Sequence, residues 1–383
     1  MKIDNKQLVS LFVSSLLILI IGAGLIPLLP VYAESLGADS TISGLYLAFT
    51  YLALAMGALS AGKLVGNRLG RKRVLILGFL ASIPLTWSLG QARSIWALIF
   101  LTALLWFSGG LGMALINIIA GTSAGEFERG KIFGILGLTN ALGSIIGGLV
   151  SGWLVETWNY TTMFSVMAGL MFLGPISALF INVKASERTH SEDENIEENE
   201  PLGRNYWLLF AASIATSIVG YIILLTRSIS MNDMGFNPFE ITSTFVAGGL
   251  ISLPIPYLMG SLSDRVERKH VLVVGYLFRI PAIILLAFSM RLWHFWLLSI
   301  LDGIAVGTSI SVGNAYVTDI VSRKAFGRGM AIFGMTTCVS GIVGFALTGV
   351  MLENLGLVLS CLLGAGVGLV ATMLLLPIRS NQF

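Results

Sequence analysis

Two ionisable residues stand out because each lies deep inside a long apolar run. Arg279 falls within residues 271–290 and Asp302 within residues 292–316. A charge near the middle of a bilayer costs about 2.5–3.5 kcal/mol on insertion scales, so each of these side chains needs a partner. If the two runs are antiparallel helices, Arg279 and Asp302 lie at nearly the same depth, because each is separated from the shared turn by a similar number of residues. The two side chains are therefore predicted to pair.

The pair has two interpretations, and the sequence leaves both open. In the first, Asp302 takes up a proton and couples it to the movement of another molecule, with Arg279 as its partner. In the second, the pair is a structural ion pair between neighbouring helices. Other reactive groups are sparse: Cys338 and Cys361 both lie in apolar runs. We therefore predict no disulfide framework and no metal site.

The composition indicates which solvent surrounds these charges. Hydrophobic residues make up 55% of the 383 residues and charged residues only 11%, whereas a soluble domain carries about 25% charged residues. The mean hydropathy is +0.87, which indicates lipid as the solvent. Neither a nucleotide-binding loop, an HExxH motif nor a nucleophile elbow is present. We expect neither an enzyme nor a nucleic-acid-binding protein.

Twelve stretches are long and apolar enough to cross a membrane as helices. They predict an all-α membrane protein with two six-helix bundles, residues 1–185 and 205–383, joined by an acidic linker at 186–204. The linker is rich in glutamate and poor in apolar residues, so it is predicted to be solvated. The expected spans are 8–32, 42–65, 74–89, 95–122, 131–155, 162–183, 206–225, 239–259, 271–290, 292–316, 329–352 and 355–376.

The lysines and arginines predict the orientation. Most of them lie at the termini, in the linker and in the turns on the same side as the termini, and such positive segments stay in the cytoplasm. Arg93, Arg227 and Arg291 fall on the opposite side, and Arg279 falls inside a span. The prediction is a multi-pass protein of the plasma or inner membrane with both termini and the linker cytoplasmic.

The two halves resemble each other at an offset of 197 residues. Residues 74–80, VLILGFL, match residues 271–277, VLVVGYL, without a gap. The same offset pairs Arg71 with Arg268 and Asn117 with Asn314. Each half has an even number of spans, so both halves enter the membrane in the same direction. Parallel repeats of this kind place the substrate site of a transporter at their interface.

One turn carries a family motif. Residues 260–269 read GSLSDRVERK, which resembles the G-x-L-x-D-R-x-G-R-K signature of the major facilitator superfamily, with Glu267 in place of the second glycine. The turn at residues 62–72 keeps the R-x-G-R-K end but has Asn67 where the family has aspartate. Helix count, duplication and motif together make the whole chain similar to this superfamily. Within it, the chain is most like the twelve-helix drug–proton antiporters that act in multidrug efflux.

The resemblance implies a cytoplasmic gate. In the family, the motif aspartate docks against a neighbouring helix end and holds one conformation closed, which Asp264 is able to do here and Asn67 is not. The gate motif comprises Gly260, Asp264, Arg265, Arg268 and Lys269 in the second half, and Asn67, Arg68, Gly70, Arg71 and Lys72 in the first. The alternative is that these residues only set the topology.

Two further family patterns are partly present. The antiporter signature G-P-x-x-G-G is matched at residues 143–148 by Gly143, Gly147 and Gly148 without the proline, and simple helix packing explains such glycines equally well. Where the family places a coupling arginine, four residues before Gly110, this chain has Trp106. The spans that line the family's central cavity contribute mostly neutral and aromatic side chains. The substrate-cavity candidates are Trp106, Asn117, Asn140, Tyr221 and Asn314.

These observations predict a secondary active transporter that works by alternating access. The neutral lining suits a small lipophilic or weakly polar molecule, since a multiply charged substrate requires an arginine clamp. We expect proton-coupled efflux, with a proton symporter or facilitator that imports a neutral solute such as a sugar as the alternative. The expected energy source is a proton gradient with no cofactor. The expected partners are a small-molecule substrate and membrane lipid, and the protein is expected to be a monomer.

Overall fold

The computed structural model describes residues 4–65, 70–123, 129–181, 200–322 and 324–378. Within these ranges the regular structure is helical, and no strand is present. By proximity, the chain forms two compact units, the first comprising Met1–Gly37 and Phe49–Ile196 and the second Ala38–Ala48 and Glu197–Phe383. Most of the predicted acidic linker, residues 186–199, lies outside the described ranges.

The first unit is built around two long helices that pack along each other, α1 (Asn5–Leu25) and α6 (Arg129–Thr157). Its other helices are α2 (Leu29–Ser35), α3 (Ser40–Val65), α4 (Arg71–Leu89), α5 (Ile95–Ser123), α7 (Tyr160–Met171) and α8 (Leu173–Leu179). Helix α4 packs against α5, α7 and α8, and α1 also contacts α5 and α8. The first residues of α3, up to Ala48, group with the second unit.

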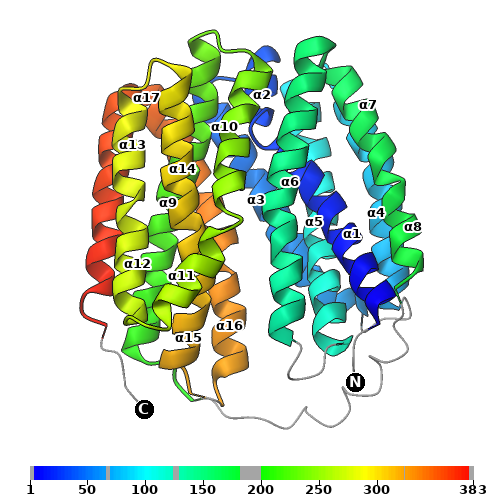
Figure 1. The fold of residues 1–383 in the computed structure, drawn as a ribbon. Helices are drawn as coiled ribbons and strands as arrows, with labels where there is room; N and C mark the ends of the chain where they lie inside the picture. Colours follow the sequence, from blue (N-terminus) through cyan, green and yellow to red (C-terminus); the bar gives the residue numbers. More distant parts are fainter. Residues whose placement is uncertain (1–3, 66–69, 124–128, 182–199, 323, 379–383) are drawn as a thin grey trace. The chain divides into compact units, whose positions relative to one another are not determined.

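The second unit repeats this plan, with α9 (Arg204–Asp233) packed along α17 (Thr336–Leu375). Figure 1 shows both helices among the green to red segments. The remaining helices are α10 (Pro238–Ile251), α11 (Ile255–Ser263), α12 (Arg268–Leu277), α13 (Arg279–Ala287), α14 (Leu292–Thr308), η1 (Ser309–Gly313), α15 (Asn314–Ile320) and α16 (Phe326–Gly334). The segment η1 is a π-helical turn between α14 and α15.

Several predicted spans are interrupted helices rather than single rods, and proline explains three of the interruptions. Pro27 lies between α1 and α2, Pro254 between α10 and α11, and Pro281 just inside α13. Proline has no backbone N–H and its ring clashes with the preceding turn, so a helix breaks or kinks there. The break before α13 falls at Phe278, directly ahead of Arg279.

The number of spans agrees with the predicted fold. Eleven helical segments among the described residues are long and apolar enough to cross a membrane, and the last of them, Phe326–Leu375, is 50 residues long. Gly356 interrupts this segment with a φ of 76° and a ψ of 176°, a conformation open to glycine because it has no Cβ. The segment therefore contains two spans, which brings the total to twelve. The prediction of an all-α, twelve-helix membrane protein is confirmed.

Candidate functional site

The predicted pair of deep charges forms an ion pair in the second unit. Nε of Arg279 lies 2.9 Å from Oδ1 of Asp302, and the side chains are only 6% and 20% exposed, respectively. The Arg279 guanidinium also donates to the carbonyl oxygen of Thr216 and, at 3.3 Å, to its hydroxyl. A Cβ at position 220 would lie 2.9 Å from Nη2 of Arg279, so Gly220 leaves the room that this side chain occupies. The arginine is thus held by α9 as well as by α14.

A second arginine lies close to this pair, and here the sequence-based prediction was wrong. The expected helix ended at residue 225, which left Arg227 in an outside turn, whereas α9 continues to Asp233 and Arg227 is only 5% exposed. Its Nη1 donates to the hydroxyl of Ser299 on α14. Its guanidinium carbon lies 3.6 Å from the ring centroid of Phe245 on α10. The polar residues in this segment lowered the hydropathy, but residues 226–231 are buried by protein.

Helix α14 therefore presents one charged and one hydroxyl group to two arginines. Ser299 and Asp302 are three residues apart, so they lie on the same face of the helix. Ser299 accepts from Arg227 of α9 and Asp302 from Arg279 of α13. The Asp302 carboxylate also attracts the Arg227 guanidinium. We call Arg227, Arg279 and Asp302 the buried charge cluster; it contains two cations and one anion.

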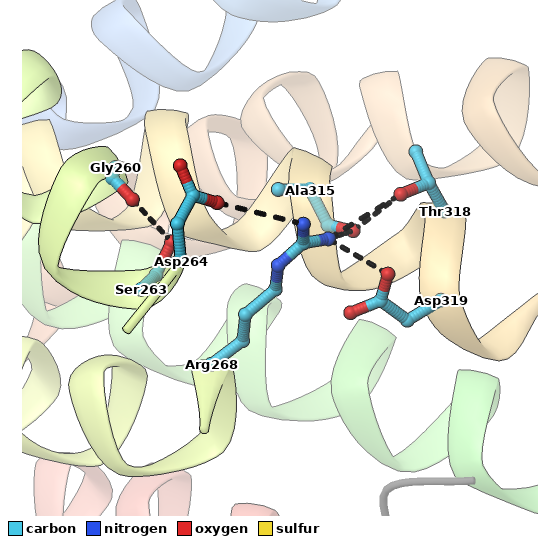
Figure 2. A network of polar contacts seen from close by, with 7 residues as sticks. All are labelled: Gly260, Ser263, Asp264, Arg268, Ala315, Thr318 and Asp319. Carbon is cyan, nitrogen blue, oxygen red and sulfur yellow. Dashed lines mark hydrogen bonds and ion pairs between the residues drawn. The ribbon is translucent and has the colours of Figure 1, made fainter. Parts of the chain in front are cut away.

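The gate-motif turn of the second unit carries a polar network around Arg268, drawn in Figure 2. Nη1 of Arg268 lies 2.5 Å from the carbonyl oxygen of Ala315 and 2.8 Å from Oδ1 of Asp319, while Nη2 lies 3.9 Å from Oδ1 of Asp264. Asp264 is 72% exposed and Asp319 42% exposed. The short contact that anchors the turn is therefore made by Asp319, which sequence reasoning did not single out.

The remaining gate residues fall into two groups. Asn67 and Arg68 lie outside the described residues. Gly260 starts the last turn of α11, where its carbonyl oxygen accepts from the Asp264 N–H at 3.2 Å and from the Ser263 hydroxyl at 2.7 Å. In the second unit Arg265 is exposed, and in the first Gly70 is exposed and Arg71 half-buried.

Both motif lysines contact a helix end. Nζ of Lys72 lies 2.5 Å from the carbonyl oxygen of Leu179, the last residue of α8. Nζ of Lys269 donates to the carbonyl oxygen of Leu376 and, at 3.1 Å, to that of Ile378, just beyond α17. Carbonyl groups at a helix C-terminus have no partner within the helix and carry partial negative charge, so an ammonium group is favourable there.

The glycines of the antiporter-like motif lie where α6 meets α1. A Cβ at Gly143 would lie 2.8 Å from the backbone of Leu19, and a Cβ at Gly147 would lie 2.8 Å from Cα of Gly24. Gly148 is buried on the same helix. Small residues of this kind allow two helix backbones to approach closely.

The substrate-cavity candidates differ in their exposure. In the first unit Trp106 is 5% exposed, whereas Asn117 and Asn140 are exposed. In the second unit Asn314 is exposed, with its amide donating to Ile310 at 2.9 Å. The ring of Tyr221 lies 4.9 Å from that of Phe345 and its hydroxyl donates to Thr337 at 3.1 Å. The three asparagines and Tyr221 thus present polar groups that are not fully buried.

The described residues contain no group of three histidine, cysteine, aspartate or glutamate side chains suited to a metal ion. Both cysteines there are free.

Comparison with known proteins places these features in context. A family model described as Major Facilitator Superfamily matches residues 11–256 and 208–382. The chain is 27% identical over 320 residues to multidrug resistance protein MdtG of Enterobacter lignolyticus (strain SCF1), covering 79% of this chain and 75% of that protein. It is 27% identical over 297 residues to the protein of the same name from Klebsiella pneumoniae (strain 342), covering 73% and 71%.

Solved structures show the same fold at low sequence identity. A POT family transporter in complex with thioalcohol conjugated peptide superposes with a TM-score of 0.78 at 15% identity, covering 96% of this chain and 95% of that one. A bacterial homolog of the human lysosomal transporter Spinster, in an inward-facing and occupied conformation, superposes with a TM-score of 0.74 at 17% identity, again covering 96% and 95%. These likenesses concern the fold alone.

Proposed function

Because this chain belongs to the Major Facilitator Superfamily, we propose that it is a proton-coupled exporter of small lipophilic or weakly polar molecules. The protein is a membrane transporter of small molecules and a non-enzymatic carrier. The proposal of export is supported by the similarity of the chain to multidrug resistance proteins over about three quarters of both chains. The proposed transport cycle is alternating access, as in other transporters built from two parallel repeats.

The buried charge cluster supplies a group suited to proton coupling. Asp302 is a carboxylate within a membrane span, 20% exposed and paired with Arg279. Protonation removes its charge and weakens its attraction to both arginines, so the protonated and ionised states favour different side-chain arrangements. Intramembrane carboxylates that behave in this way are typical of proton relays. Asp302 is our proposed coupling residue, with the proton gradient as energy source and no cofactor.

We also propose a location, an orientation and an oligomeric state for the protein. Positive residues in the terminal segments and in the turns on the same side orient both termini toward the cytoplasm of a cell with a plasma or inner membrane. Large apolar side chains such as Leu258, Val370 and Met373 are more than half exposed, which suits direct contact with lipid. We propose that the chain acts as a monomer in lipid. In the second unit Asp264 and Arg268 belong to the cytoplasmic gate.

Proteoliposomes test the coupling directly. The purified protein is reconstituted into liposomes. The liposomes are loaded with fluorescent lipophilic compounds and assayed with and without an imposed pH gradient. We expect substrate movement against its gradient only when protons flow the other way. Uptake of a neutral sugar in the direction of proton flow, with no transport of lipophilic compounds, would instead establish the importer.

A matched pair of variants assigns the coupling group. Asp302→Asn is expected to abolish gradient-driven transport while leaving the binding and downhill exchange of neutral substrates intact. Glu156→Gln, which removes an exposed carboxylate of α6, is expected to transport as the wild type does. Gradient-driven transport that survives in Asp302→Asn removes this residue from the proton pathway.

A further inference from the structure

Arg227 belongs to the buried charge cluster, but the proposed proton coupling through Asp302 and Arg279 gives it no function. It is 5% exposed, and its Nε has no hydrogen-bond partner in the structure. The ion pairs of the described residues include Arg279 and Asp302 but not Arg227. A guanidinium group has five N–H donors and no acceptor, so a buried one that makes a single side-chain hydrogen bond is under-satisfied. Such a group favours an additional acceptor.

The charge balance of the cluster leads to the same conclusion. Arg227 and Arg279 each carry a positive charge, and Asp302 supplies one negative charge that is already engaged by Arg279 at 2.9 Å. One positive charge in the protein interior therefore remains uncompensated. Burying an unpaired charge is costly, and natural proteins meet that cost with a paired group of opposite sign. What the cluster lacks is a single negative charge.

The neighbours of Arg227 hold its guanidinium ready for a ligand. The Phe245 ring lies 3.6 Å from the guanidinium carbon and the Ser299 hydroxyl, itself 2% exposed, accepts from Nη1. These two contacts fix the plane of the side chain, which leaves Nε oriented but unbound. The preceding residue, Thr226, is fully buried and its hydroxyl also has no partner. A fixed N–H fork beside a free hydroxyl suits a carboxylate or a halide.

We propose that Arg227 forms a binding site for one negative charge, supplied either by the carboxylate of an amphipathic substrate or by chloride. The inference rests on the proposed function. It adds lipophilic monocarboxylates to the substrates that we expect the protein to export. Asp302, three residues from Ser299 on α14, competes with the bound anion for the same positive charges. Anion binding and the ionisation of Asp302 are therefore coupled, and each weakens the other.

Binding measurements on the full chain in lipid nanodiscs test this site without relying on transport. The probes are 2-naphthoate and its neutral counterpart 2-naphthamide, in a low-salt HEPES buffer free of carboxylates and halides, with and without added chloride. We expect naphthoate to bind at least tenfold more tightly than naphthamide, because a charge-assisted hydrogen bond contributes more than a neutral one. Arg227→Gln is expected to remove that preference. Arg291→Gln, which neutralises an exposed arginine at the start of α14, is the matched control and should retain it.

The chloride arm separates the two sources of the anion. Chloride that raises the thermal stability of the wild type and lowers naphthoate affinity indicates one shared site. Chloride stabilisation without any naphthoate preference supports the site with chloride as its ligand, and the reverse supports the substrate carboxylate. Equal affinities for the two naphthyl compounds together with no chloride effect would overturn the proposal. An equal loss in Arg291→Gln would overturn it too, because it would indicate general surface electrostatics.

Two further variants protect the test from a folding defect in Arg227→Gln. Arg227→Lys keeps the charge but not the fork, so it should retain chloride stabilisation and lose most of the naphthoate preference. Asp302→Asn removes the competing carboxylate, so its anion affinity should rise severalfold and chloride should stabilise it more than the wild type. Anion affinity unchanged in Asp302→Asn would contradict the coupling. A binding result of either sign stands apart from the transport assay, so failure of the proposed export leaves this test readable.

Discussion

The two halves of the chain keep the same plan but stabilise equivalent places by different means. Where α1 meets α6, a Cβ at Gly24 would lie 2.6 Å from the backbone of Gly147. At the offset of 197 residues, Tyr221 corresponds to Gly24 and Gly344 to Gly147. A Cβ added at Gly344 would lie 2.9 Å from the Cβ of Tyr221. The first half thus brings two backbones together, and the second separates them with an aromatic side chain.

The charged positions differ more strongly. Arg279 and Asp302 of the second half correspond, at the same offset, to Ser82 and Leu105. The Ser82 hydroxyl donates to its own helix at Gly78 and, at 3.1 Å, to the Ser108 hydroxyl. A neutral hydroxyl contact in the first half therefore stands where the second half has a buried ion pair. This asymmetry is the reason that the proposed coupling residue, Asp302, lies in the second half and has no counterpart at the equivalent position of the first.

The largest expected effect comes from giving the second half the residues of the first. Asp302→Leu alone leaves both buried arginines without an acidic partner and is expected to destabilise the protein by about 3–5 kcal/mol, whereas Arg279→Ser leaves Asp302 near the Arg227 guanidinium and should cost less. The double variant has neither charge and should recover most of that loss. Thermal unfolding of the detergent-solubilised variants provides the measurement. A double variant as unstable as Asp302→Leu would show that the two halves cannot exchange these residues.

The double variant also separates the two interpretations of the pair. If it recovers stability and still couples transport to protons, Asp302 has a structural role only. The transporter then takes its protons elsewhere or needs none.

The next largest effect concerns the close helix approach of the first half. Gly147→Ala inserts a methyl group against the Gly24 backbone, and overpacking of this kind costs about 1–3 kcal/mol. Gly344→Ala meets the Tyr221 Cβ at 2.9 Å, a less severe approach than that of an added Cβ at Gly147 to the Ile20 carbonyl oxygen, so its cost should be smaller. Gly137→Ala lies on the same helix as Gly147 with nothing within 4 Å of the added Cβ. This control should be neutral or stabilising, since alanine is the better helix former.

A smaller effect is expected at the turn around Arg268. Asp319→Thr installs the residue found at the equivalent position 122 and removes the 2.8 Å partner of Arg268. Because this pair is partly exposed, the loss should be about 1 kcal/mol and should shrink at high salt. Asp264→Asn removes a carboxylate that is 3.9 Å away and 72% exposed, so it should cost less than half as much. A larger effect from Asp264 in stability scans at two salt concentrations would give the motif aspartate the leading role instead.

The smallest effect tests the feature that both halves share. Lys72→Met and Lys269→Met each remove an ammonium group from a helix C-terminus, worth about 0.3–1 kcal/mol. Both lysines make the equivalent contact, and Lys269 also contacts Ile378, so the two losses should agree within about a few tenths of a kcal/mol, with any excess at Lys269. A difference beyond that range in paired thermal scans would show that the halves differ here as well.

The fold was largely predictable because lipid imposes a simple rule on sequence. A span needs a long apolar run, so the helix number and the depth of Arg279 and Asp302 followed from run lengths, while the repeat followed from the matching residues 74–80 and 271–277. The interruptions at Pro27 and Pro281 were less visible, because a broken helix keeps the same apolar length.

The site was predictable only in part, for a physical reason. Arg227 was missed because polar residues at the end of a span resemble a solvent-exposed turn, and only tertiary packing reveals that protein covers them. Asp319 was missed because it lies three residues beyond the expected end of its span at residue 316. Hydropathy describes the contact of a segment with lipid, and it contains no information on contacts between neighbouring helices.

The two lysine contacts also bear on the history of the chain. Lys72 reaches Leu179, and Lys269 reaches Leu376, across the same separation of 107 residues. The simplest origin of two identical contacts in duplicated halves is one contact in a single ancestral six-helix protein. That ancestor already joined the start of its third span to the end of its sixth, so it closed its own bundle before it was copied. On this interpretation, carboxylates such as Asp302 and Asp319, which correspond to Leu105 and Thr122 in the first half, reflect divergence of the two copies after the duplication.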